Sequence, residues 1–449
     1  MTESERLFTE TPVRRLFLTA AIPGALGMLM QSAYEVLDGV FVGRFLGEKS
    51  FAAINLALPF VIVCFAFGDL IGVGSAVPIS IARGKGQHGK ANNIFTCACL
   101  MNVGFGLVTG IGFLLFAPLI MSLMGATGEL QAQGTLYLRV YAAFLPITSV
   151  CYAGDNYLKT CGMVRRSLWS NSLLAISGAA LEFYLLGVVG LGVGAAAFAY
   201  SFAMVVAVVV SLWPFIMGRA DLAFCRPHFT RALLSEIVHD GMPTFLENVS
   251  GRVTSIILNV ALLALGGEEA VSIFGVAIVT ETVIVPILYG TLDALQPAIG
   301  FNWGAGNRQR VRSLERCCFI AAFVISLVYV AVCCAVPKQI VLIFMPEADA
   351  EFLRVGTFAV LAFTVSYLIR WFSLATQSYM VAIGESRLAA IISVAQSFVF
   401  PLAALALLWP LGLTGLWFNM AASSLATSVL AAFVLRHFRR GPSRLAGGD

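Results

Sequence analysis

Long apolar stretches, separated by short polar or glycine-containing turns, run along nearly the whole chain. A helix that crosses a bilayer needs about 20 consecutive residues that are mostly apolar. The pattern predicts twelve such helices, at residues 16–43, 51–79, 94–123, 136–158, 168–189, 192–217, 242–265, 273–299, 317–345, 353–378, 388–409 and 412–435. The chain is therefore expected to be an all-α polytopic membrane protein.

The turns between these segments repeat 220 residues further along the chain. The glycine-rich, basic segment 84–90 is echoed at 304–310, and the same offset places Gly47 on Gly267. An internal duplication of this kind is typical of transporters with a substrate path between two similar lobes. We expect two parallel copies of six helices, divided into an N-terminal lobe (1–217), a cytoplasmic linker (218–241) and a C-terminal lobe with a cytoplasmic tail (242–449).

Composition and charge support this interpretation and give it a direction. The 449 residues are 59% hydrophobic and only 12% charged, whereas soluble proteins carry about a quarter charged residues. Most of the 28 lysines and arginines fall in the turns on one side, which is expected to be cytoplasmic. Both termini then lie in the cytoplasm. The expected location is the plasma membrane, the inner membrane in a bacterium, where the chain acts as a lipid-embedded monomer.

Nothing in the sequence indicates an enzyme, a cofactor or a nucleic-acid partner. The four histidines fall in expected cytoplasmic segments, and the ten cysteines form no metal-like pattern. A phosphate-binding loop of the Walker type is missing from the sequence, which argues against transport driven by ATP. We therefore expect a small amphipathic or cationic molecule as the ligand, with no firmly bound metal.

Two acids of the N-terminal lobe are the strongest candidates for chemistry, because ionisable groups inside a bilayer are costly and usually functional. Asp38 and Glu182 precede outer turns by similar lengths, which places them at a similar depth, and Glu35 lies one turn before Asp38. Such groups can share a proton or hold a cation, sodium included. The alternative is that they cap helices or pair with polar neighbours. Because the repeat places Leu258 and Leu402 at the corresponding positions, we assign cation coupling to this lobe.

The other acids expected inside the membrane are candidates for a substrate cavity. Asp69 and Glu281 fall nearer to mid-membrane. Asp155 and Asp293 fall near cytoplasmic helix ends, where a structural role is equally well supported. Glu247 follows a proline near the inner end of its helix, as an acid of the first helical turn would.

Two further kinds of residue complete the predicted cavity. Arg370 is expected to neutralise one of the acids, although the sequence does not identify which one. Tyr34 and Tyr152 can form part of an adaptable wall for bulky ligands. Ordinary helix packing is the more common role for such aromatic residues.

Several motifs are grouped in the predicted helices, and together they are specific. They are Ile22-Pro23 with Tyr34–Gly43 in the first helix, Gly72–Ala76 in the second, Asn156–Lys159 with Gly162 in the fourth, Leu181-Glu182 in the fifth and Gln296–Ala305 in the eighth. In these residues the chain resembles the multidrug and toxic compound extrusion (MATE) family over essentially all twelve spans. The resemblance implies a secondary active antiporter that exports organic cations or other amphipathic drugs in exchange for protons or sodium ions. It also implies that Asp38 is the coupling carboxylate.

The chain departs from the family's pattern near that carboxylate. Glu35 stands where an asparagine is usual, and Glu182 replaces an aspartate. Gly178 stands where sodium-coupled members often carry an asparagine, and the loss of that amide favours protons over sodium. The extra acids Glu35 and Asp69 favour cationic substrates.

The alternative function is a lipid-linked saccharide flippase of the same wider superfamily. Such proteins usually need a strongly basic cavity that holds a pyrophosphate group. Only Arg252 and Arg370 are expected within the membrane, against eight acids. The charge balance therefore argues against a flippase.

Overall fold

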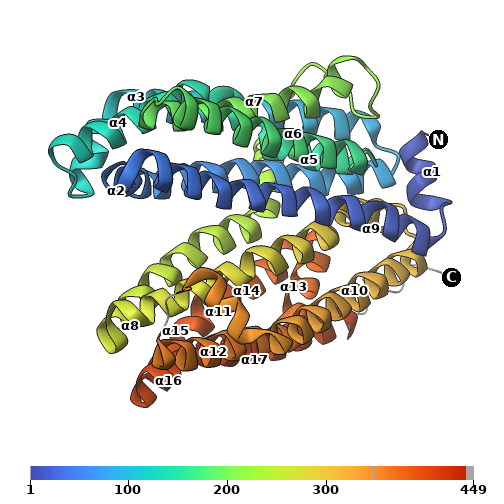
Figure 1. Cartoon of the computed structure of the whole chain (residues 1–449). Helices are drawn as coiled ribbons and strands as arrows, with labels where there is room; N and C mark the ends of the chain where they lie inside the picture. Colours follow the sequence, from blue (N-terminus) through green and yellow to red (C-terminus); the bar gives the residue numbers. More distant parts are fainter. Residues whose placement is uncertain (1, 347–348, 441–449) are drawn as a thin grey trace. The chain divides into compact units, whose positions relative to one another are not determined.

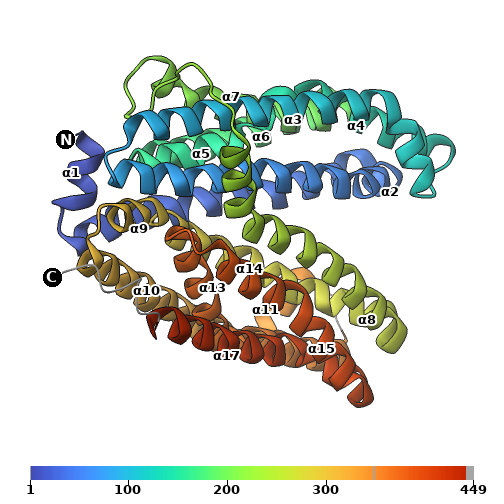
Figure 2. The ribbon, with the colours of Figure 1, turned by 180° about the vertical axis from the view of Figure 1, so that it is seen from behind.

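The computed structural model describes residues 2–346 and 349–440, which are mostly helical and include no strand. They group into two compact units, one made of Met1–Thr11 with Ile22–Gly241 and the other of Pro12–Ala21 with Met242–Asp449. We call these the N-terminal unit and the C-terminal unit. Figures 1 and 2 show the helices from two sides, coloured along the sequence.

The helices of the first half of the chain come in the following order. They are α1 (Glu3–Thr9), α2 (Val13–Gly84), α3 (His88–Leu123), α4 (Gly128–Thr148), α5 (Cys151–Thr160), α6 (Val164–Glu182), the π-helix η1 (Phe183–Val188) and α7 (Val193–Ile216).

The second half begins with the long helix α8, whose first residues belong to the N-terminal unit. Its elements are α8 (Arg231–Asp293), α9 (Gln296–Gly304), α10 (Arg308–Ala335), α11 (Pro337–Phe344), α12 (Ala350–Val365), α13 (Tyr367–Ala382), α14 (Ser386–Val394), the π-helix η2 (Ala395–Val399), α15 (Phe400–Leu408), the 3₁₀-helix η3 (Trp409–Leu411), α16 (Gly412–Trp417) and α17 (Asn419–Arg440).

Helices α2 and α8 each contain two membrane spans joined by one glycine. Gly47 has φ 76° and Gly267 has φ 64°, a backbone conformation that favours glycine, and the helical φ/ψ is broken there. A straight helix of the 72 residues of α2 would be about 108 Å long, far longer than the hydrocarbon core of about 30 Å. The two breaks are 220 residues apart, as the sequence repeat predicts.

The predicted membrane fold is confirmed. Across the two described ranges, ten helical segments are long and apolar enough to cross a membrane. Two of the ten are the segments that turn back at Gly47 and Gly267. Counting each of these as two spans gives the twelve that the apolar pattern predicts.

Five predicted spans differ from the structure in their continuity. Two of them, 273–299 and 412–435, are interrupted at 294–295 between α8 and α9 and at Phe418 between α16 and α17. The span predicted at 136–158 is interrupted between α4 and α5, shortly after Pro146, which cannot donate a backbone hydrogen bond. The span predicted at 353–378 is interrupted at Ser366, between α12 and α13. The span predicted at 317–345 is wrong at its end, because α10 stops at Ala335 and Pro337 begins a separate helix. Apolar pattern alone does not register such breaks.

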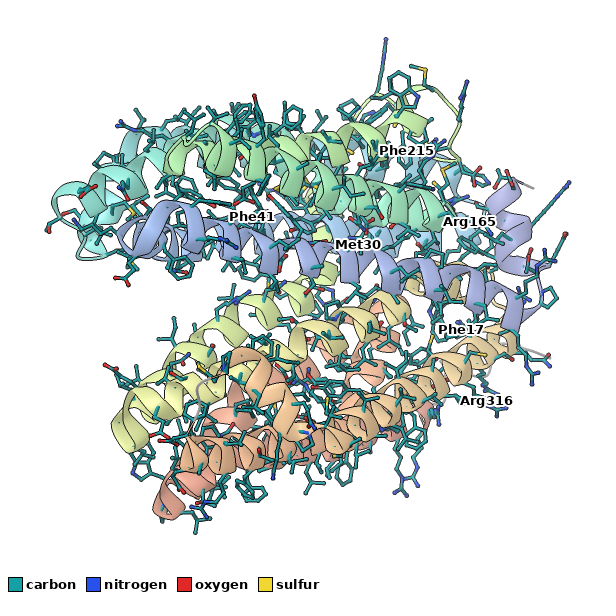
Figure 3. All side chains as sticks on the ribbon, viewed as in Figure 1. Phe17, Met30, Phe41, Arg165, Phe215 and Arg316 are labelled. Carbon is teal, nitrogen blue, oxygen red and sulfur yellow. The ribbon has the colours of Figure 1, made fainter. Side chains whose placement is uncertain are left out.

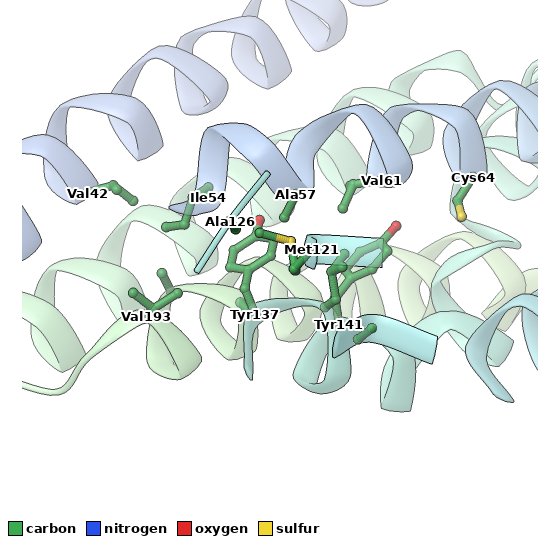
Figure 4. Close-up of a cluster of buried hydrophobic side chains, with 14 of the residues drawn as sticks. Val42, Ile54, Ala57, Val61, Cys64, Met121, Ala126, Tyr137, Tyr141 and Val193 are labelled. Carbon is green, nitrogen blue, oxygen red and sulfur yellow. The ribbon is translucent and has the colours of Figure 1, made fainter. Parts of the chain in front are cut away.

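Each unit has its own apolar core. In the N-terminal unit, α2, α3, α4 and α7 meet in a buried cluster that includes Ile54, Val61, Met121, Tyr141 and Val193 (Figure 4). In the C-terminal unit, α8, α12 and α16 contribute to a second cluster, with Leu262, Phe274, Phe363 and Trp417 among its members. Many large apolar side chains outside these cores stay exposed, as expected for surfaces that contact lipid tails.

Helix α1 is anchored to one end of the N-terminal unit by a buried arginine. The guanidinium of Arg83 donates to Asp221 at 2.6 Å, to the hydroxyl of Ser4 at 2.7 Å and to the carbonyl of Thr160 at 2.7 Å. Ser4 also donates to Asp221. Arg165 lies at the same end (Figure 3). These contacts tie α1 to the ends of α2 and α5 and to the segment that follows α7.

Candidate functional site

Glu182 is a fully buried acid at the end of α6. Neither of its carboxylate oxygens makes a hydrogen bond of good geometry to any residue that the structure describes. Buried polar groups are nearly always hydrogen-bonded, because desolvation without a partner is costly. The π-helix η1 begins at the next residue, and single π-turns inside α-helices are frequent at functional sites. Glu182 is therefore a strong candidate for a group that binds something.

Asp38 on α2 lies beside this buried acid. The two carboxyl groups are close enough for their charges to interact strongly. The hydroxyls of Tyr34 and Tyr137 lie within electrostatic range of both acids, and both tyrosines are buried. From the sequence, Asp38 and Glu182 are expected to lie at a similar depth in the membrane, and the structure places them side by side. We call Asp38 and Glu182 the N-terminal carboxylate pair.

A glycine one turn before Glu182 makes room for Tyr34. A Cβ atom placed on Gly178 would lie 2.5 Å from Cζ of Tyr34 and 2.8 Å from its hydroxyl oxygen. The ring of Tyr34 also stacks on Tyr200, with centroids 5.9 Å apart. The space beside Gly178 is therefore filled by the phenol of Tyr34.

A second group of polar residues surrounds Tyr152 on α5. Gln31 donates to its hydroxyl at 3.2 Å, and the charges of Glu35 and Asp69 both act on it. Phe65 contacts its ring edge-on, with centroids 5.5 Å apart. Glu35 is exposed and lies one turn before Asp38. Because its charge acts on Tyr152, it is close to this tyrosine as well as to the carboxylate of Asp38.

Asp155 has a partner of its own. Its carboxylate pairs with Lys159 at 2.7 Å and accepts hydrogen bonds from Ser167 at 2.5 Å and Asn171 at 3.2 Å. The lysine lies four residues later on α5, and its side chain is 3% exposed. This saturated arrangement favours a structural role for Asp155, one of the two roles that the sequence supports.

In the C-terminal unit, Arg370 neutralises Glu281. Nη1 of Arg370 lies 2.6 Å from the carboxylate, and both side chains are more than four-fifths buried. The hydroxyl of Tyr367 donates to the same oxygen at 2.6 Å. The partner that the sequence left open is therefore Glu281.

Two more acids of this unit are hydrogen-bonded. Glu247 accepts from the hydroxyl of Tyr289 and, at 2.6 Å, from the amide of Gln377. Asp293 accepts from Gln296 at 2.6 Å and from Ser378 at 3.3 Å. The expectation that Glu247 is an acid of the first helical turn is wrong, because α8 begins at Arg231.

Several of these partners were missed by reasoning from the sequence. Lys159 and Tyr367 carry a signal in hindsight, since they stand four and three residues from Asp155 and Arg370 on one helix face. Tyr137 and Gln377 carry none, because they reach their acids from another helix.

Two matches to one family model confirm the duplication and identify the family. The MatE model matches twice, over residues 23–184 and 243–406, and the two matches begin 220 residues apart. The matched residues make up well over half of the chain.

Curated relatives match nearly end to end. The multidrug export protein MepA of Staphylococcus haemolyticus (strain JCSC1435) is 24% identical over 434 residues, which cover 96% of this chain and 95% of the relative. MepA of Staphylococcus aureus (strain NCTC 8325 / PS 47) is 25% identical over 442 residues, again covering 96% and 95%.

Solved structures share the fold. A crystal structure of MATE in complex with MaL6 has a TM-score of 0.92 at 22% identity, covering 97% of this chain and 98% of that one. An outward-facing multidrug resistance MATE family transporter has a TM-score of 0.91 at 22% identity, with the same coverage. The chain therefore belongs to the MatE family, the multidrug and toxic compound extrusion transporters that its helix motifs resemble.

Proposed function

We propose that this transporter is a secondary active antiporter that exports organic cations or other amphipathic drugs in exchange for protons, by alternating access. The names of its curated relatives, multidrug export proteins, support the direction and the substrate class. In this proposal the chain works as a monomer in the plasma membrane with both termini in the cytoplasm, and uses no cofactor besides the coupling ion.

The observation that carries the proposal is the full burial of Glu182 beside Asp38, without a hydrogen bond of good geometry to either carboxylate oxygen. An ionised carboxylate in such a place would need a cation or several donors, whereas a protonated carboxyl group is neutral. A proton that binds the carboxylate pair in one state and leaves it in the other biases the exchange between states. Without such a difference in affinity, the ion gradient would drive nothing.

Protons are favoured over sodium by the surroundings of Glu182. A sodium ion would need further oxygen ligands, and an amide at position 178 would offer one. Gly178 offers no side chain, and the ring of Tyr34 occupies the space above it. We therefore propose proton coupling at the carboxylate pair, and treat sodium as the competing outcome of the test.

The aromatic residues of the N-terminal unit suit a cationic substrate. Tyr34, Tyr200, Phe65 and Tyr152 form a continuous series of ring contacts, with centroids 5.5–6.2 Å apart. Aromatic faces attract organic cations, and the attraction grows when water is excluded. Glu35, which acts on Tyr152 and Tyr200, adds the negative charge.

A flippase for lipid diphosphates fits this charge distribution poorly. Of the two arginines expected within the membrane, Arg370 is paired with Glu281. A pyrophosphate bound in the N-terminal unit would lie near the carboxylate pair and near Glu35 and Asp69. The negative charges of these acids would repel it. We therefore do not propose this activity.

The test is dye efflux from proteoliposomes under an imposed pH gradient or an imposed sodium gradient. We expect the pH gradient alone to drive efflux, and Asp38→Asn and Glu182→Gln to abolish the response. Glu129→Gln, a change at an exposed acid, is the control and keeps it. Efflux by Asp38→Asn at the rate of the unchanged protein would exclude the carboxylate pair as the coupling site. Efflux driven only by the sodium gradient would identify sodium, not the proton, as the coupling ion.

A further inference from the structure

In the C-terminal unit, Arg370 contacts one buried acid, Glu281, and lies within electrostatic range of a second, Glu247. Nη1 of Arg370 contacts Glu281 at 2.6 Å, the hydroxyl of Tyr367 at 3.1 Å and Sδ of Met420 at 3.5 Å. The charge of Arg370 also acts on Glu247. The guanidinium thus pairs with Glu281 on the second span of α8, and its charge reaches Glu247 on the first span.

The donors of this network lie on one face of α13. Tyr367, Arg370 and Gln377 follow each other by three and seven residues, spacings that keep side chains on the same side of a helix. Gln377 donates to Glu247 at 2.6 Å and to Ser393 at 2.8 Å, which links the network to α14. The helix therefore presents a row of fixed donors to acids on its neighbour.

A cation held in this way differs from a bound ion because it cannot leave. Two carboxylates inside a membrane protein are stable only with compensating charge or donors. In the N-terminal unit, no lysine, arginine or histidine of the described residues forms an ion pair with Asp38 or Glu182. In the C-terminal unit the compensation is covalently attached to the chain.

We propose that Arg370 is a tethered cation that permanently occupies a monovalent-cation site formed by Glu281 and the hydroxyl of Tyr367. The site is closed to exchangeable cations while the guanidinium is present, and it opens to a free guanidinium ion when the side chain is shortened. This proposal goes beyond antiport and does not depend on it, because it concerns binding in the C-terminal unit.

The experiment removes the tether and supplies the cation in solution. Purified Arg370→Ala is compared with the unchanged protein for binding of radiolabelled guanidinium and for thermal unfolding, at concentrations far below those that denature. We expect one guanidinium bound per chain in Arg370→Ala and none above background in the unchanged protein. We also expect a lowered unfolding temperature that rises again with guanidinium, because a ligand that binds the folded state stabilises it.

Two further variants keep the proposal testable if Arg370→Ala folds poorly. Arg370→Met combined with Glu281→Gln removes both charges, so it should fold without guanidinium and bind none. Arg252→Ala removes an exposed arginine of the same unit and should also bind none. No guanidinium binding by Arg370→Ala, or a double variant less stable than Arg370→Ala, would overturn the tethered-cation role.

Discussion

The two units share several structural elements but differ in the partners that they give to their buried acids. Both contain a helical hairpin closed by a glycine with positive φ, at Gly47 and Gly267, and both contain a π-helix, η1 or η2. The N-terminal unit leaves Glu182 without a good hydrogen bond, whereas the C-terminal unit surrounds Glu281 with donors. Two copies of one scaffold can thus differ, with a buried acid that lacks good hydrogen bonds in one copy and a buried acid with hydrogen-bond donors in the other.

The difference extends to the packing around the acids. Tyr34 packs on Gly178 in the N-terminal unit. The repeat offset places Thr254 and Phe398 at the corresponding positions, and the hydroxyl of Thr254 donates to the carbonyl of Ser397 at 2.6 Å. Large and small side chains have exchanged places between the copies. The phenol beside the acids is therefore a property of one unit.

The largest expected effect comes from giving the N-terminal unit the residues of its copy. The double change Asp38→Leu and Glu182→Leu should abolish efflux driven by a pH gradient. The fold should remain, because apolar side chains replace two acids, one of which is fully buried without a hydrogen bond of good geometry. Efflux assays and thermal unfolding on the same preparation measure both effects.

The matched change in the C-terminal unit is Glu281→Leu. It leaves Arg370 buried without its carboxylate and should lower the unfolding temperature. A double leucine variant that unfolds more easily than Glu281→Leu would show that the acids of the N-terminal unit are structural.

A smaller effect is expected where α1 meets the N-terminal unit. Arg83→Ala breaks a pair in which the arginine side chain is 1% exposed, and such losses typically cost about 3 kcal/mol. Arg165→Ala, at an exposed arginine of the same end, is the control. Chemical denaturation of both variants measures the difference. Equal stabilities would mean that α1 is not anchored by Arg83.

Gly178→Ala tests the packing of Tyr34. Its Cβ would overlap the phenol ring, and overpacking of this kind costs about 1–3 kcal/mol. Efflux should fall with stability, because Tyr34 must move away from the carboxylate pair. If Gly178→Ala alone changes neither quantity, the glycine is not needed at this position.

The smallest effects are expected at exposed ion pairs, one in each unit. Lys49 pairs with Glu129 at 3.4 Å and Arg354 pairs with Glu351 at 2.6 Å, all with largely exposed side chains. Water and salt screen such exposed pairs, so they contribute little to the free energy of unfolding. Lys49→Ala and Arg354→Ala should therefore leave unfolding curves almost unchanged, and a large shift in either would show an unexpected role for that pair.

The sequence predicted the frame better than the contacts. The spans and the turn at Gly47 follow from apolar length and from a glycine repeat, which are local properties of the chain. The pairing of Arg370 with Glu281 was not predictable, because α13 and α8 are far apart in sequence and many acids were possible partners. The breaks at Ser366 and after Pro146 were missed because they lie inside apolar stretches.

The most direct test of coupling by the N-terminal carboxylate pair is proton release on substrate binding. Purified protein in weakly buffered detergent solution receives an organic cation that it transports, and the released protons are counted with a pH dye. The account predicts release by the unchanged protein and by Glu247→Gln, and none by Glu182→Gln. Release that persists in Glu182→Gln and disappears in Glu247→Gln would contradict it and assign coupling to the C-terminal unit.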